Sequence, residues 1–155
     1  MPKPLDGVVE ALQAGLRNHW TQVLLYETQS AHFARWGYSK LAVQFLAYAE
    51  EERGHARSCV QRLEFFDAQP TYEFEEPLWP RHDFEGIINV DREIDYVAAN
   101  TERAGYLLCL RVGDAETAEL FAELLKGSEH AIAEIEATLQ VIEQIGLDNY
   151  LADRT

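Results

Sequence analysis

The chain has 155 residues, 27 of them acidic and 13 basic, with a formal net charge of -14 at pH 7. A chain of this length predicts one domain, residues 1–155, because a domain near this size buries roughly 70% of its unfolded surface. The acidity argues against binding to nucleic acid or an anionic membrane, and no segment has the roughly 18 consecutive apolar residues of a membrane span. The start, MPKPLDGVVEALQAGL, lacks the pattern of a secretory signal, so we expect a soluble, cytoplasmic protein.

Apolar residues recur in steps of three and four from Val9 to Phe33, which predicts a first helix over residues 5–34. Trp36-Gly37 would end it. A second pattern of the same kind predicts a helix over residues 41–66, with Glu52 and His55 on its apolar stripe.

The pattern breaks over residues 67–83, where Pro70, Pro77 and Pro80 are incompatible with a helix. This segment is long enough to run back along the length of the molecule. It therefore predicts two helical hairpins joined by a crossover rather than a simple meander.

Helices are predicted over residues 83–111 and 114–145, and the short Val112-Gly113 link makes them antiparallel neighbours. In the tail GLDNYLADRT, Gly146 stops the fourth helix and Asp148 is predicted to cap one last short helix. The expected fold is all-α: an up-down four-helix bundle with a long crossover between its second and third helices and a short C-terminal fifth helix.

Polar residues interrupt each apolar stripe at similar heights. They are His19 and Tyr26, then Tyr48, Glu52 and His55, then Asp95 with Asp91 or Glu102 as alternatives, and finally Ser128. A buried ionised carboxylate without a partner costs several kcal/mol, so these groups should meet one another or a cation. One interpretation is a metal-free hydrogen-bonded layer, with Glu52 bonded to His19 or Tyr26 and His55 bonded to Asp95.

The other interpretation is a metal site. Glu52 and His55 form a Glu-x-x-His pair, whose i, i+3 spacing places both side chains on one helix face, as in carboxylate bundles that hold iron or manganese. With His19 and Asp95 the set has two imidazoles and one or two carboxylates, which suits one Zn²⁺ or Fe²⁺. Tyr26 and Tyr48 would orient or cap the site.

Other polar residues are weaker candidates. His130 lies about 100° from the apolar stripe of its helix, and we interpret it as a polar-face residue. His32 and His82 are expected at the surface or in a loop. Cys59 and Cys109 lack a C-x-x-C spacing and are expected to be reduced thiols.

The chain resembles the bacterioferritins, a branch of the ferritin-like superfamily, over almost its whole length. The resemblance rests on ARWGYSKL, EEERGHA, the crossover and above all VIEQIGLDNYLA, which is similar to the junction of that branch's fourth and fifth helices. It implies a shell of 24 subunits that oxidises ferrous iron at a di-iron site inside each bundle and stores the mineral in its cavity.

The family's ligands are a Glu on the first helix, Glu-x-x-His on the second, a Glu on the third and Glu-x-x-His on the fourth. Of these, only Glu52 and His55 match. The other positions hold His19, Asp95, Ser128 and Ala131. The departures put the di-iron centre in doubt, so the resemblance implies a ferroxidase centre that is lost or reduced to a single metal site.

The branch also binds haem through a methionine just after the second-helix Glu. Here that position is Arg53, and Met1 is the one methionine of the chain, so no haem is expected. The predicted function is a subunit of an iron-storage or iron-homeostasis shell, with further copies of itself as partners. Two alternatives stay open: a structural subunit that co-assembles with a site-complete ferritin subunit, and an oxidase-type protein with a mononuclear metal.

Overall fold

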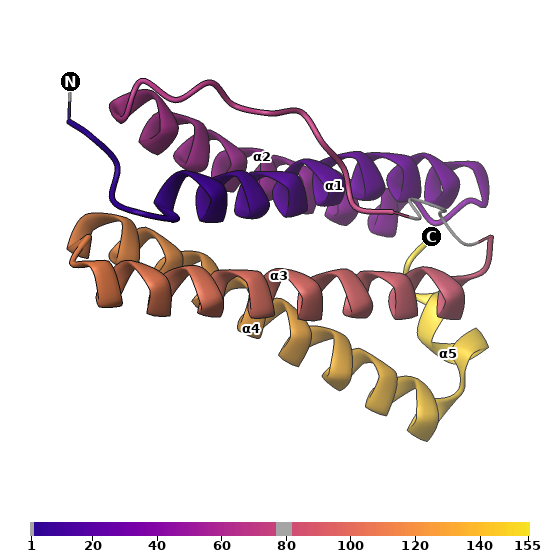
Figure 1. The fold of residues 1–155 in the computed structure, drawn as a ribbon. Helices are drawn as coiled ribbons and strands as arrows, with labels where there is room; N and C mark the ends of the chain where they lie inside the picture. The colour runs from indigo at the N-terminus through magenta and orange to yellow at the C-terminus, as the bar shows by residue number, and fades with distance from the viewer. Residues whose placement is uncertain (1, 77–81) are drawn as a thin grey trace.

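The computed structural model describes residues 2–76 and 82–155, which form helices and connecting segments with no strand among them. The helices are α1 (Val8–Arg35), α2 (Ser39–Phe65), α3 (Phe84–Val112), α4 (Ala115–Ile145) and α5 (Leu147–Ala152). Four long helices and a short fifth confirm the predicted all-α bundle (Figure 1).

The four long helices form two hairpins, α1 with α2 and α3 with α4, as predicted. The segment after α2 runs back along the first hairpin, so that α2 and α3 point in the same direction (Figure 1). Residues 67–76 of this crossover contain no helix, and Pro77 and Pro80 lie outside the described residues. The Arg17 Nε donates to Glu75 Oε1 at 3.0 Å and thereby ties the crossover to α1.

Most helix ends lie within two residues of the predictions, and α2 begins at Ser39 rather than residue 41. Two differences have a clear physical reason. Helix α1 begins at Val8 rather than residue 5, directly after Gly7, whose φ of 82° is a left-handed conformation that favours glycine. The prediction that Asp148 caps the last helix is wrong. Gly146, with φ 85°, is the N-cap of α5, and Asp148 lies in the first turn, because α4 and α5 are separated by this single residue.

The apolar core has two parts, one at each end of the bundle. The part near α5 is centred on Phe33, Leu41 and Phe45, and the part at the opposite end is centred on Leu12, Leu16, Phe121 and their neighbours. Buried polar side chains lie between the two clusters. They include His19, Gln22, Gln29, Asp91, Asp95, Glu102 and Ser128. The predicted polar layer is therefore present inside the bundle.

Helix α4 diverges from α3 towards its C-terminal end, where α5 packs (Figure 1). Ala131, Ile135 and Leu139 are consequently only partly buried, although they lie on the apolar stripe of α4. The divergence leaves a cavity between α2 and α4.

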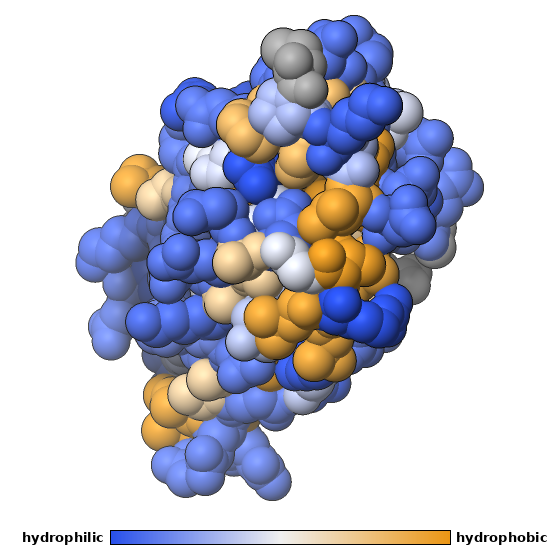
Figure 2. All heavy atoms as spheres, turned by 60° about the vertical axis from the view of Figure 1, so that its left-hand side comes forward, coloured by the Kyte–Doolittle hydropathy of each residue, from blue (hydrophilic) through white to orange (hydrophobic). Residues whose placement is uncertain are grey.

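The surface carries both charged and apolar side chains. Figure 2 shows apolar side chains gathered on the face that includes the end of the bundle where α1 begins. Phe65 at the end of α2 and Leu107 and Leu110 near the end of α3 are exposed.

Trp20 and Trp36 are partly buried, and Trp79 lies outside the described residues. No described helix has the length and apolar composition that crossing a membrane would require.

Candidate metal centre

Three predicted ligands meet in the polar layer: His19 of α1 with Glu52 and His55 of α2. Glu52 Oε2 lies 2.7 Å from His19 Nδ1 and 3.3 Å from His55 Nδ1. Over residues 2–76 and 82–155 this is the one group of three or more His, Cys, Asp or Glu side chains whose ligand atoms all lie within 4.8 Å of one another. The structure thus brings together three of the four predicted ligands.

The local helical geometry explains this meeting. The i, i+3 spacing on α2 places Glu52 and His55 on the same face, and α1 packs against that face along its length. The His19 side chain is 1% exposed, that of Glu52 15% and that of His55 27%. The site is therefore closed at His19 and most accessible at His55.

Electrostatics keep Glu52 ionised. Burial raises the pKa of its carboxyl, but the hydrogen bonds and charges of His19 and His55 outweigh burial and lower the pKa to about 2. The hydrogen bond with Glu52 in turn raises the pKa of His55 above its ordinary value, against the opposing effect of burial. An ionised carboxylate between two imidazoles is a suitable donor set for a divalent cation.

Glu102 of α3 approaches the other side of the His19 ring. Its Oε1 lies 3.4 Å from His19 Nε2, and its side chain is 0% exposed. Neither of its oxygens has a hydrogen-bond partner within the described residues, so this approach is an electrostatic contact. Burial raises the pKa of Glu102 to about 7, partly offset by His19 and by Ser128.

Asp95, the fourth predicted ligand, lies outside the group. Its Oδ1 accepts a 2.6 Å hydrogen bond from Gln22 Nε2, and Asp91 Oδ1 accepts a matching 2.6 Å bond from Gln29 Nε2. Burial raises the pKa of both carboxyls to about 8. The metal-free interpretation paired Glu52 with His19 or Tyr26, and the 2.7 Å hydrogen bond between Glu52 and His19 is present. It also paired His55 with Asp95, which is wrong, because the observed partner of Asp95 is Gln22 of α1.

The remaining candidates are spread around the centre. Tyr48 accepts a 2.6 Å hydrogen bond from Gln44 rather than bonding Glu52. On α4, Ser128 is buried and Ala131 partly buried, and neither carries a carboxylate. His130 is 75% exposed and lies 3.4 Å from Glu134, in agreement with its interpretation as a polar-face residue.

Comparison with known proteins identifies the family. The sequence model of the ferritin-like domain family matches residues 9–145, which span the four long helices. The bacterioferritin of Brucella melitensis is 29% identical over 115 residues, covering 74% of this chain and 71% of the relative.

Two further relatives cover more of the chain. The bacterioferritin of Mycolicibacterium paratuberculosis is 25% identical over 145 residues, covering 94% of this chain and 91% of the relative. The bacterioferritin of Rhodobacter capsulatus is 24% identical over 139 residues, covering 90% of this chain and 86% of the relative. The chain therefore belongs to the ferritin-like family, in its bacterioferritin branch.

Proposed function

We propose that the chain is a subunit of a cytoplasmic iron-storage or iron-homeostasis shell, and that the interior of each bundle binds one divalent metal ion through His19, Glu52 and His55. The observation that carries the metal site is the convergence of three donor atoms, His19 Nδ1, Glu52 Oε2 and His55 Nδ1. The shell is supported by the family match and by the similarity to bacterioferritins.

The donor set supports one ion rather than two. Ligand atoms around one tetrahedral ion lie about 3.4 Å apart when the metal–ligand bonds are about 2.1 Å long. The 3.3 Å separation between Glu52 Oε2 and His55 Nδ1 is close to that value. The 2.7 Å hydrogen bond between Glu52 Oε2 and His19 Nδ1 would have to lengthen by about 0.7 Å around an ion. Two irons would need several carboxylates to bridge them and to offset their charge, whereas α4 offers Ser128 and Ala131. The ion would be Zn²⁺ or Fe²⁺.

Glu102 has a supporting role in this proposal. With the metal on His19 Nδ1, the Nε2 would carry a proton, and it lies 3.4 Å from Glu102 Oε1. A small rotation of the ring would turn this contact into a hydrogen bond. Such a carboxylate fixes the tautomer and the orientation of a ligating imidazole and increases its basicity. The 0% exposure of the Glu102 side chain keeps water from replacing it.

The proposal includes no haem. Arg53 occupies the position of the haem methionine, and its guanidinium pairs with Glu27 and Glu50 instead of offering a soft donor atom. The proposed partners are further copies of the chain, in a shell of 24 subunits. The exposed apolar residues Phe65, Leu107 and Leu110 support burial against other copies.

A second candidate is a structural subunit that co-assembles with a site-complete ferritin chain. The lack of a carboxylate at Ser128 and Ala131 favours it, because a partner chain would then supply the ferroxidase activity. Co-purification of such a chain from the native cell would support this candidate. An oxidase-type function would instead show oxygen consumption with one metal per purified chain.

Metal stoichiometry tests the site directly. Purified wild type, Glu52→Ala and His55→Ala are dialysed against Zn²⁺ or anaerobic Fe²⁺ and analysed by mass spectrometry of the metal. We expect about one ion per wild-type chain and almost none in either variant, since each variant loses a ligand. His130→Ala is the matched control, because it removes an exposed imidazole. Two ions per chain with fast ferrous oxidation would refute the single-ion site, and an empty wild type would favour the metal-free layer.

A further inference from the structure

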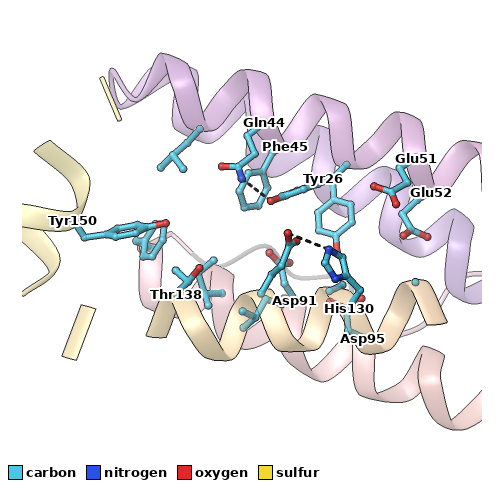
Figure 3. A pocket seen from close by; sticks show the side chains of 18 residues that line it. Tyr26, Gln44, Phe45, Glu51, Glu52, Asp91, Asp95, His130, Thr138 and Tyr150 are labelled. Atoms are coloured by element: carbon cyan, nitrogen blue, oxygen red, sulfur yellow. Dashed lines mark hydrogen bonds and ion pairs between the residues drawn. The ribbon is translucent and has the colours of Figure 1, made fainter. Parts of the chain in front are cut away.

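A cavity lies between α2 and α4, next to the candidate metal centre (Figure 3). Its volume is about 90 Å³. One water needs roughly 15 Å³ on the same measure, so the cavity holds about six waters or a small organic molecule. Glu52 lines one side of it, while His19 and His55 do not.

The walls of the cavity combine apolar and acidic side chains. The apolar side chains include Leu41, Phe84, Ile88 and Ile135. The acidic side chains are Glu51, Glu52, Asp91, Asp95 and Glu134. No described lysine or arginine lines it. His130 is the one imidazole among the described residues of the lining, and its Nε2 already lies 3.4 Å from Glu134 Oε1. The carboxyls outnumber this imidazole, so the wall disfavours an anionic ligand.

Asp95 has an unused hydrogen-bonding atom in this wall. The residue is 1% exposed. Its Oδ1 accepts from Gln22, but its Oδ2 has no hydrogen-bond partner among the residues the structure describes. A buried carboxyl oxygen without a partner is costly, and a donor brought by a ligand would remove that cost.

Three aromatic rings form another part of the lining. The ring centroids of Tyr26 and Tyr48 are 5.8 Å apart, those of Tyr26 and Phe45 6.0 Å, and those of Phe45 and Tyr48 5.4 Å. The π faces of aromatic rings attract cations, and groups of such rings recognise organic ammonium ions. The aromatic and acidic parts of the wall thus favour the same ligand charge.

A metal ion fits the acidic wall less well than an organic cation does. Asp91 and Asp95 belong to no group of three or more ligand atoms within 4.8 Å among the described side chains. A divalent ion would also leave the apolar walls without a contact. We propose that this cavity binds a small organic cation, a protonated amine with an apolar body. The ammonium group donates to Asp95 Oδ2 beside the three rings, and the apolar body lies against Leu41 and Ile88.

Three probes of similar shape and different charge test the proposal. The full-length protein is titrated with benzylammonium, benzyl alcohol and benzoate up to about 10 mM, by calorimetry and ligand-observed NMR. We expect benzylammonium to bind at least about tenfold more tightly than benzyl alcohol, and benzoate not to bind. Equal affinity for the alcohol, binding of benzoate, or no binding of benzylammonium would overturn the proposal.

Two substitutions assign the site. Asp95→Asn and Asp91→Asn keep the side-chain shape and can still accept from Gln22 and Gln29, so the fold should persist and circular dichroism checks it. Asp95→Asn should weaken benzylammonium binding by about tenfold and leave benzyl alcohol unchanged. Glu93→Gln is the matched control, because Glu93 lies between the two aspartates but is exposed. Unchanged benzylammonium binding in Asp95→Asn would refute the site, whatever the effect of Asp91→Asn. The titrations contain EDTA, which keeps divalent ions out of the metal centre, so the result does not depend on that centre.

Discussion

Replacing Glu52 with glutamine removes the negative charge between His19 and His55 but keeps the length of the side chain. The pKa of Glu52 falls from 4.5 to about 2 on folding, a difference of about 2.5. At 1.36 kcal/mol per pKa unit, the ionised carboxylate contributes about 3 kcal/mol to the free energy of unfolding. Glutamine retains neutral hydrogen bonds to the imidazoles, which are about half as strong. The expected loss at pH 7 is therefore about 1.5–3 kcal/mol.

The pH dependence has a definite sign. A depressed carboxyl pKa contributes stability that is fully present above the unfolded pKa of 4.5 and is lost as pH falls through the folded pKa of about 2. The difference between wild type and Glu52→Gln should accordingly shrink between pH 5 and pH 2. The assay is urea unfolding of metal-free protein at one fixed protein concentration, because assembly also contributes to stability.

Glu51→Gln is the matched control, since Glu51 is the exposed neighbour of Glu52. It should change the free energy of unfolding by less than about 0.5 kcal/mol. A loss below about 0.5 kcal/mol for Glu52→Gln at pH 7, or a difference that stays constant down to pH 2, would refute the reasoning.

Three further predictions concern the metal, the core and the assembly. Zn²⁺ at one hundred times its dissociation constant should stabilise the wild type by about 2.7 kcal/mol in calorimetry and His55→Ala not at all; equal stabilisation of both would place the metal elsewhere. Gly105→Ala should cost about 1–3 kcal/mol in urea unfolding, because its Cβ would lie 2.7 Å from Phe121 Cζ. Gly54→Ala, with open space at its Cβ, should instead gain up to about 1 kcal/mol; the same sign for both would contradict the packing. Leu107→Glu should shift the mass in solution to smaller species by light scattering, and an unchanged mass would exclude this apolar face from the assembly.

Helix periodicity was sufficient to predict the bundle and the three side chains that meet at the candidate metal centre. Prolines in the crossover and the short link before α4 determine which helices pair, and both features are visible in the sequence. The i, i+3 spacing of Glu52 and His55 likewise determines their shared face, whatever packs against it. His19 could be assigned to the same site because a buried histidine on the apolar stripe of α1 needs a polar partner at the same height in the bundle.

The sequence alone could not determine which carboxyl of α3 lies beside His19. Asp95 and Glu102 lie seven residues apart on one stripe, so either can face inwards. Seven residues correspond to an axial shift of about 10.5 Å, and that shift depends on how the two hairpins pack together. The periodicity of one helix contains no information on this axial shift between the two hairpins. The structure places Glu102 beside His19 and Asp95 beside Gln22.

The hydrogen-bond partners also explain why carboxyls in one polar layer have different pKa values. Imidazoles bond Glu52 and lower its pKa to about 2, whereas an amide bonds Asp95, whose pKa burial raises to about 8. An amide donates a hydrogen bond but no charge, so it cannot offset the desolvation of an ionised carboxylate. At neutral pH the layer thus has an anionic end at the histidines and a protonated end at the glutamines. A metal ion is favoured at the first end because the carboxylate there is already ionised. At the second end, an ammonium group would take the place of the carboxyl proton of Asp95, and its positive charge would stabilise the ionised carboxylate.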